Sequence, residues 1–275
     1  MKVIVTGATG FLGGWTLRHL RNRGIDAIGV SRSVHDPVRG IIQSSDWSEL
    51  PRADVLLHFA ESNNRFAVNQ QGQSYFDTTV EQTKKLFHHG FSQLIYASSI
   101  AVYDEGQAFS RSVREKLVPP DFYGHTKLAI EDLFLQKGGT VLRVANAYGT
   151  GMSPMNVISH IMNQVRTADL IELGSLDPIR DYVWGGDIAL AFNIAAHKKL
   201  NNVYNIASGK GHSVRQVAEI IQKIANKNLP MKEREYRPNS IIILDNQETL
   251  RDFSWIPETK LEDGLRSTFF SQGSP

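Results

Sequence analysis

The chain has 275 residues, of which 41% are hydrophobic and 21% charged, a composition typical of a globular protein with a well-buried core. Its 30 basic and 28 acidic residues leave a net charge of +2, which gives no electrostatic reason to expect nucleic acid or a membrane surface as a partner. The absence of cysteine excludes disulfides, thiolate metal sites and cysteine nucleophiles.

No apolar run approaches the ~20 residues that a membrane helix needs. The first apolar run, which ends at Gly7, is too short for a signal peptide. We therefore expect a cytoplasmic protein. No cluster of metal-binding side chains stands out in the sequence, so no metal is expected.

The first half of the chain alternates short β-branched runs with helical patterns, which is typical of βαβ units around a parallel sheet. The expected strands are 2–6, 26–30, 41–42, 55–59, 94–97 and 140–144, and the expected helices are 11–23, 75–89 and 123–136. This order predicts an α/β fold with a Rossmann-type, doubly wound parallel sheet.

The alternation loosens after about Gly149. Helical patterns at 152–166, 187–196 and 214–225 stand among short strand patterns near Ile171 and at 203–206. We expect residues 1–150 to form a dinucleotide-binding Rossmann domain. Residues 151–275 are expected to form a smaller substrate-binding lobe, part of which returns to the first domain.

A glycine-rich loop, Thr6-Gly7-Ala8-Thr9-Gly10-Phe11-Leu12-Gly13, stands between the first expected strand and the first expected helix. In a dinucleotide-binding fold, one such glycine permits the tight turn, one lets the backbone approach the pyrophosphate and one lets the helix pack on the strand. The helix N-terminus adds partial positive charge for the phosphates. The order of strand, loop and helix therefore predicts a bound nicotinamide dinucleotide rather than a plain turn.

The end of the second expected strand discriminates between the two nicotinamide dinucleotides. NAD-binding folds usually place an acidic residue there, ~20 residues after the glycines, to hold the ribose 2′-hydroxyl. Here Ser31 and Arg32 occupy this position. Serine can donate a hydrogen bond to a 2′-phosphate, and arginine adds positive charge. The pair favours NADP(H), with NAD as the alternative if Arg32 is only a solvated loop residue.

Tyr123 and Lys127 lie four residues apart, so one helix would project both from the same face. A phenol with a pKa of ~10 is a poor base near neutrality, and a neighbouring ammonium favours the phenolate. Such a tyrosine can exchange a proton with a substrate oxygen while hydride moves to or from the nicotinamide. Ser98 and Ser99, at the carboxyl end of an expected strand, can supply a hydroxyl to the same oxygen.

With these motifs in place, the chain resembles the extended short-chain dehydrogenases/reductases of the NAD-dependent epimerase/dehydratase family, which modify nucleotide sugars. The matching segments run nearly end to end, at 6–13, 57–60, 96–103, 123–127, 142–149, 180–183, 204–206 and 255–257. Each segment is weak alone, but their order and spacing are specific.

The resemblance implies catalytic roles for Ser99, Tyr123 and Lys127. It implies cofactor contacts at Gly7, Gly10, Phe11, Leu12, Gly13, Asp46, Trp47, Phe59 and Ala60, besides Tyr123 and Lys127. Asp46 and Trp47 match by position only and could be turn residues. Substrate contacts are implied at Ser99, Asn146 and Arg180, and at Asn156 within a stretch that could also be an ordinary helix N-terminus.

Within this family, the residues beside the catalytic serine separate the chemistries. Dehydratases and decarboxylating members use acidic residues there, and this chain has Ile100 and Ala101. Members that epimerise carbons beside the ketone recruit a cysteine, which this chain lacks. Two reactions remain, the reduction of a 4-keto nucleotide sugar with NADPH and the 4-epimerisation of a nucleotide sugar with NAD. Ser31 and Arg32 favour the reductase.

Two other hypotheses about the function stay open. Some proteins of this fold bind a dinucleotide without catalysis, although they commonly lose the tyrosine or the lysine that this chain keeps. A reductase of a hydrophobic carbonyl compound is also possible. Relatives often dimerise through two helices of each subunit, so we expect a homodimer through helices 75–89 and 123–136. The sequence does not divide the apolar residues of these helices between core and interface.

Overall fold

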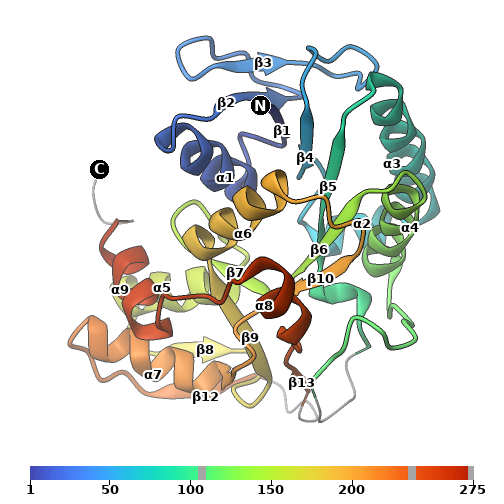
Figure 1. The fold of residues 1–275 in the computed structure, drawn as a ribbon. Coiled ribbons are helices and arrows are strands. Elements are labelled where there is room, and N and C mark those ends of the chain that lie inside the picture. Colours follow the sequence, from blue (N-terminus) through green and yellow to red (C-terminus); the bar gives the residue numbers. More distant parts are fainter. Residues whose placement is uncertain (105–109, 235–239, 272–275) are drawn as a thin grey trace.

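A seven-stranded parallel sheet lies at the centre of the computed structural model, which describes residues 1–104, 110–234 and 240–271. The strand order is β10-β6-β5-β4-β1-β2-β3 (Figure 1). The bounds are β1 (Lys2–Thr6), β2 (Asp26–Ser31), β3 (Ile41–Gln43), β4 (Val55–His58), β5 (Gln93–Ser99), β6 (Thr140–Val144) and β10 (Val203–Ile206). Because the chain starts near the centre and builds outward on both sides, the expected Rossmann-type, doubly wound sheet is confirmed.

The inner strands are buried on both faces, as their continuous apolar runs require. Every residue of β4 and β6 is buried. Successive side chains of a strand point to opposite faces, so Val3 and Val5 pack in one hydrophobic cluster and Ile4 packs in another. This double burial fixes the register and aligns the carboxyl ends of β1, β4 and β5 at one edge of the sheet.

Helices cover both faces of this sheet (Figure 1). On one face, α1 (Phe11–Asn22) packs against α6 (Gly185–His197), and on the other α3 (Gln73–Leu86) packs against α4 (Phe122–Gln136). The short helix α2 (Arg65–Gln71) precedes α3, and the 3-10 turns η1 (Phe87–His89) and η2 (Ile100–Val102) follow α3 and β5. The predicted helix 75–89 therefore ends in a 3-10 turn rather than as one α-helix.

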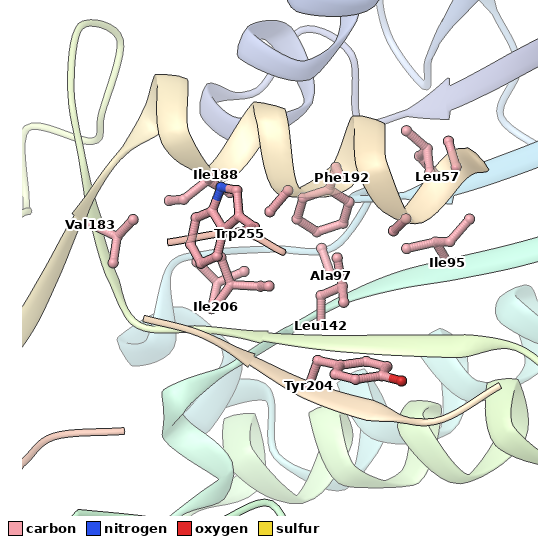
Figure 2. Packing of buried hydrophobic residues seen from close by; sticks show 14 of the residues in the cluster. Leu57, Ile95, Ala97, Leu142, Val183, Ile188, Phe192, Tyr204, Ile206 and Trp255 are labelled. Carbon is pink, nitrogen blue, oxygen red and sulfur yellow. The ribbon is translucent and has the colours of Figure 1, made fainter. Parts of the chain in front are cut away.

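Figure 2 shows the core between α6 and the sheet, to which distant parts of the chain contribute. Ile188 and Phe192 of α6 pack over the strands, near Leu142 of β6 and Ile206 of β10. Trp255, from the C-terminal part of the chain, joins the same cluster and donates from its indole N–H to the carbonyl of Asp187 at 3.2 Å. The C-terminal part thus helps to close this face of the sheet.

The second half of the chain also forms smaller sheets with a core of their own. The strands are β7 (Asn146–Tyr148), β8 (Ile171–Leu173), β9 (Ile179–Trp184), β11 (Gly211–Ser213), β12 (Met231–Glu233) and β13 (Ile241–Ile242). The helices are α5 (Val157–Thr167), α7 (Val214–Ile224), α8 (Gln247–Phe253) and α9 (Leu261–Ser271). Of these helices, α7 packs against both α5 and α9 (Figure 1).

Helix α5 begins five residues later than the predicted start at Met152, because Asn156 caps it. The Asn156 side chain accepts a hydrogen bond from the N–H of Ile158 at 2.9 Å, and its own backbone is extended. Met152 instead lies in a turn, where its N–H donates to the carbonyl of Gly149 at 3.1 Å. The apolar pattern that predicted a longer helix therefore includes this turn.

The predicted dimer helices contribute part of their apolar surface to the core. Leu86 of α3 and Phe134 of α4 are fully buried within the subunit, so they are not available to an interface. The homodimer remains a prediction. In the part of the chain that the structure describes, no helix has the length and apolarity to cross a bilayer.

Candidate active site

A cavity of about 510 Å³, here called the main cavity, opens at the carboxyl ends of β1, β4, β5 and β6. Open α/β sheets bind ligands at this edge. Its wall contains eleven of the residues predicted for a site, namely Gly7, Gly10, Phe11, Leu12, Gly13, Phe59, Ser99, Tyr123, Lys127, Asn146 and Asn156. The fold therefore brings the predicted cofactor, catalytic and substrate residues to one place.

The glycine loop is shaped to hold a ligand close to the backbone. Gly7 has a φ of +67°, and a Cβ at this position would lie 2.8 Å from the carbonyl group of Phe59, so only glycine fits. Gly10 then begins α1 with no side-chain cap, and the first turn of the helix contains no acidic residue. The N–H groups of this turn remain to bind an anion. The loop and helix start thus fit the pyrophosphate of a dinucleotide.

Ser98 and Ser99 end β5 with different partners. Ser98 is buried and its hydroxyl donates to Glu131. Ser99 is half-buried in the wall of the main cavity, and its Oγ accepts a hydrogen bond from the N–H of Ala101 at 3.1 Å. Because the Ser99 hydroxyl accepts from the backbone, its proton can be donated to a ligand.

Tyr123 lies in the first turn of α4, where several contacts fix its position. Asp121 caps the helix by accepting from the N–H of Gly124 at 2.9 Å. Asp121 also forms an ion pair with Arg65 of α2 and accepts from Asn69 of α2 at 2.9 Å. The side-chain oxygen of Asn69 in turn accepts from the N–H of Tyr123 at 3.0 Å. Helix α2 therefore braces the start of α4 on which Tyr123 lies.

Gly124 permits the approach of α4 to the end of β5. A Cβ at this position would lie 2.5 Å from the carbonyl oxygen of Ala101, so any other residue would push the helix away. Ala101 follows Ser99 closely in the chain, and the same contact therefore brings Tyr123 and Ser99 into one cavity wall.

Lys127 is buried beneath the main cavity with two fixed partners. Its Nζ donates to the carbonyl of Ala97 at 3.1 Å and lies 3.0 Å from Oε2 of Glu61. It also lies 5.8 Å from the centre of the Tyr123 ring. Burial lowers the pKa of Lys127, but Glu61 and Tyr123 outweigh this effect and raise the pKa above its ordinary value. The side chain is therefore a charged ammonium.

A side cavity of about 210 Å³ shares Glu61 with the main cavity and is lined by Arg32, Trp47 and Ala60 among the predicted residues. Ser31 ends β2 beside the glycine loop, where its buried hydroxyl lies 3.2 Å from that of Thr9. Arg32 follows on the exposed surface. The two residues expected to select the cofactor thus lie next to the loop.

Asp46 and Trp47 occupy different surroundings. Asp46 lies outside the walls that described residues form around the two cavities. It accepts from the N–H of Ser48 at 3.0 Å and pairs with Lys85 at 3.2 Å, and both contacts hold its pKa below the ordinary value. Trp47 is only 4% exposed and packs edge-on to His58. Its side chain borders the side cavity from within the core.

Asn146 and Asn156 line the main cavity from the second half of the chain. The Asn146 amide donates to the carbonyl of Asp181 at 3.2 Å, and the Asn156 amide donates to that of Ala147 at 3.2 Å. Arg180 is different. It donates to the carbonyl of Ser240 at 2.7 Å and does not belong to either cavity wall as the described residues form it.

Several wall residues were not predicted, namely Glu61, Ser62, Asn63, Asn64, Arg65 and Phe66. Part of this segment could have been found, because Asn64 caps α2 by accepting from the N–H of Ala67 at 3.0 Å, and asparagine is a common N-cap. Glu61 had no such signal. Its partner Lys127 is distant in the sequence, so only the fold brings them together.

The comparisons with known proteins agree with this geometry. The model of the NAD dependent epimerase/dehydratase family matches residues 3–207. A GDP-6-deoxy-D-mannose reductase from Pseudomonas aeruginosa is 27% identical over 97% of this chain and 95% of its own. A UDP-glucose 4-epimerase from Oryza sativa subsp. japonica is 25% identical over 96% of this chain and 88% of its own.

Among solved structures, MoeE5 in complex with UDP-glucose and NAD superposes with a TM-score of 0.88 at 23% identity, over 99% of this chain and 98% of its own. This likeness supports the fold. The family match covers most of the chain, so the chain belongs to the NAD dependent epimerase/dehydratase family. It is an NAD(P)-dependent enzyme of the extended short-chain dehydrogenase type, as expected from its sequence.

Proposed function

We propose that this enzyme reduces a 4-keto nucleotide sugar with NADPH, using Ser99, Tyr123 and Lys127. The observation that carries the proposal is the main cavity, which places these three side chains beside a glycine loop and an uncapped helix N-terminus. The similarity to GDP-6-deoxy-D-mannose reductase over nearly the whole chain supports the substrate class.

Each side chain has a distinct task in such a reduction. A nicotinamide dinucleotide held by the glycine loop and the start of α1 would supply the hydride for the carbonyl carbon. Ser99 donates a hydrogen bond to the carbonyl oxygen, and Tyr123 transfers its hydroxyl proton to that oxygen as the alcohol forms. Lys127 places a positive charge beneath Tyr123, which favours the phenolate that remains. Asn146 and Asn156, which line the same cavity, are proposed to contact the substrate.

The proposal of NADPH rather than NADH rests on the two residues at the end of β2. Ser31 and Arg32 stand there without a carboxylate that would repel a 2′-phosphate, and Arg32 borders the side cavity. We propose cofactor contacts for these two residues and for Phe59, Ala60, Asp46 and Trp47. The division into a Rossmann domain, 1–150, and a smaller substrate-binding lobe, 151–275, belongs to the same proposal.

The test is turnover of GDP-, dTDP- and UDP-linked 4-keto sugars with NADPH and with NADH. We expect reduction with a clear NADPH preference, and we expect Arg32→Ala to weaken NADPH binding about 10- to 150-fold, because hydrogen bonds to charged groups contribute ~1.5–3 kcal/mol. NADH binding should stay unchanged. Arg39→Ala, which removes an exposed arginine of the same loop, is the matched control, and Tyr123→Phe should abolish turnover.

The second candidate is a nucleotide-sugar 4-epimerase that retains NAD. The similarity to UDP-glucose 4-epimerases over nearly the whole chain favours it. NAD that copurifies with the protein, together with the interconversion of UDP-glucose and its 4-epimer without added cofactor, would replace the reductase by the epimerase.

A further inference from the structure

The ion pair between Glu61 and Lys127 is the unexplained feature of the main cavity. The Glu61 and Lys127 side chains are only 4% and 9% exposed, and their charged atoms lie 3.0 Å apart. Glu61 lies three residues after the end of β4 and lines both the main and the side cavity. A buried carboxylate is costly unless a cation offsets its charge. Here the cation is the ammonium of Lys127, which would otherwise act on Tyr123 at full charge.

We propose that Glu61 is a positioning residue that offsets the charge of Lys127 and so keeps the Tyr123 hydroxyl protonated, ready to donate to a ketone. The inference rests on the proposed function and adds to it a preferred direction, because an enzyme that must donate a proton benefits from a protonated tyrosine at rest. An epimerase must first remove a proton from its substrate, which requires the opposite state.

The position of Lys127 also depends on Glu61. The ammonium contacts Oε2 of Glu61, three residues after β4, and the carbonyl of Ala97, within β5. Its Nζ lies 5.1 Å from the centre of the Tyr96 ring and 5.8 Å from the centre of the Tyr123 ring. The lysine is therefore fixed between the two strands before any ligand enters.

The other titratable groups described around the pair are either uncharged at pH 7 or paired with a cation other than Lys127. Burial lowers the pKa of His58 to about 4, so its imidazole is neutral at pH 7. Burial, with a smaller contribution from Glu61, raises the pKa of Tyr75 and of Tyr96, so both stay protonated. Two further carboxylates near α4 have cationic partners of their own, Asp121 with Arg65 and Glu131 with Arg143. Glu61 is the carboxylate that pairs with Lys127.

The decisive experiment follows tyrosinate formation by ultraviolet difference absorbance in the protein without cofactor or substrate. Wild type, Glu61→Gln, and the same two proteins carrying Tyr123→Phe are titrated, so that subtraction isolates the signal of Tyr123. We expect Glu61→Gln to move the midpoint of this signal down by about one pH unit, because a negative charge beside the site is lost. A midpoint that is unchanged or higher overturns the proposal.

Two further variants complete the design. Glu81→Gln removes an exposed carboxylate of α3 that pairs with Lys84, and it should leave the midpoint unchanged. Glu61→Asp keeps the charge but draws it back from Lys127, and it should give a smaller downward shift if Glu61→Gln does not fold. A wild-type midpoint in Glu61→Asp would also contradict the proposal. Since no substrate is used, failure of the proposed reduction would not affect these outcomes.

Discussion

His58, the last residue of β4, shows how one buried side chain couples the fold to pH. Its imidazole is 1% exposed, stacks on Tyr96 and Phe134, and hydrogen-bonds through Nδ1 to the Thr6 hydroxyl at 2.7 Å. Burial lowers its pKa from 6.5 to about 4. In this interval the unfolded chain binds the proton and the folded protein does not, so the free energy of unfolding falls as the pH falls from 6.5 towards 4.

The expected loss is about 3 kcal/mol, since one pKa unit corresponds to ~1.4 kcal/mol. Urea unfolding at pH 7 and at pH 4 measures it. His58→Asn can keep a hydrogen bond to Thr6 and does not titrate, so it should lose about 3 kcal/mol less than wild type over this interval. His125→Asn, at an exposed histidine of α4, should behave as wild type. If His58→Asn keeps the full pH dependence, another group is responsible.

Single residues also show what sequence can and cannot reveal about the site. Tyr123 and Lys127 could be predicted because their spacing on one helix is a local pattern, and both line the main cavity. The same holds for the glycine loop. Glu61 could not be predicted, since its role depends on a contact between the loop after β4 and α4. Arg180 was expected at the substrate; its guanidinium donates to the carbonyl of Ser240, and its contact with the substrate stays a prediction.

At the scale of elements, a buried polar network joins α4 to the sheet. Glu131 of α4 and Arg143 of β6 form a two-pronged ion pair with bonds of 3.0 and 2.7 Å, and both are almost fully buried. Arg143 also donates to the Tyr103 hydroxyl at 3.0 Å, and that hydroxyl donates to Asn205 of β10 at 2.7 Å. The network thus connects the helix that carries Tyr123 to two neighbouring strands.

Glu131→Gln should destabilise the protein by about 3–5 kcal/mol, because it leaves the buried guanidinium without a countercharge. Glu131→Leu combined with Arg143→Met should cost less than either single change, since no unpaired charge remains. Urea unfolding of wild type, Glu131→Leu, Arg143→Met and the double variant gives the coupling free energy between the two side chains. Glu81→Gln, at an exposed ion pair, should cost less than about 1 kcal/mol. Additive costs at Glu131 and Arg143 would contradict this account.

The elements themselves were predicted unevenly, for a physical reason. Strands β1 and β6 were predicted to the residue, because continuous apolar runs specify buried parallel strands. Strands β7, β9, β11 and β13 were not predicted. They are short or carry polar residues such as His212, and their pairing joins segments that lie far apart in the sequence. Their stability comes from those partners rather than from local propensity.

At the scale of the whole molecule, one hydrophobic cluster contains residues from both halves of the chain, and we expect the halves to unfold together. Phe253 and Trp255 from the C-terminal part belong to the same cluster as buried residues of β4, β5 and β6, and Figure 2 shows Trp255 in this cluster. Calorimetry should therefore show one unfolding transition. Trp255→Ala should lower the free energy of unfolding by about 3–5 kcal/mol, and the single transition should not split into two. Trp15→Phe, at the contact between α1 and β9, serves as a milder control. Two separate transitions, with only the later one sensitive to Trp255, would show instead that the halves are independent folding units.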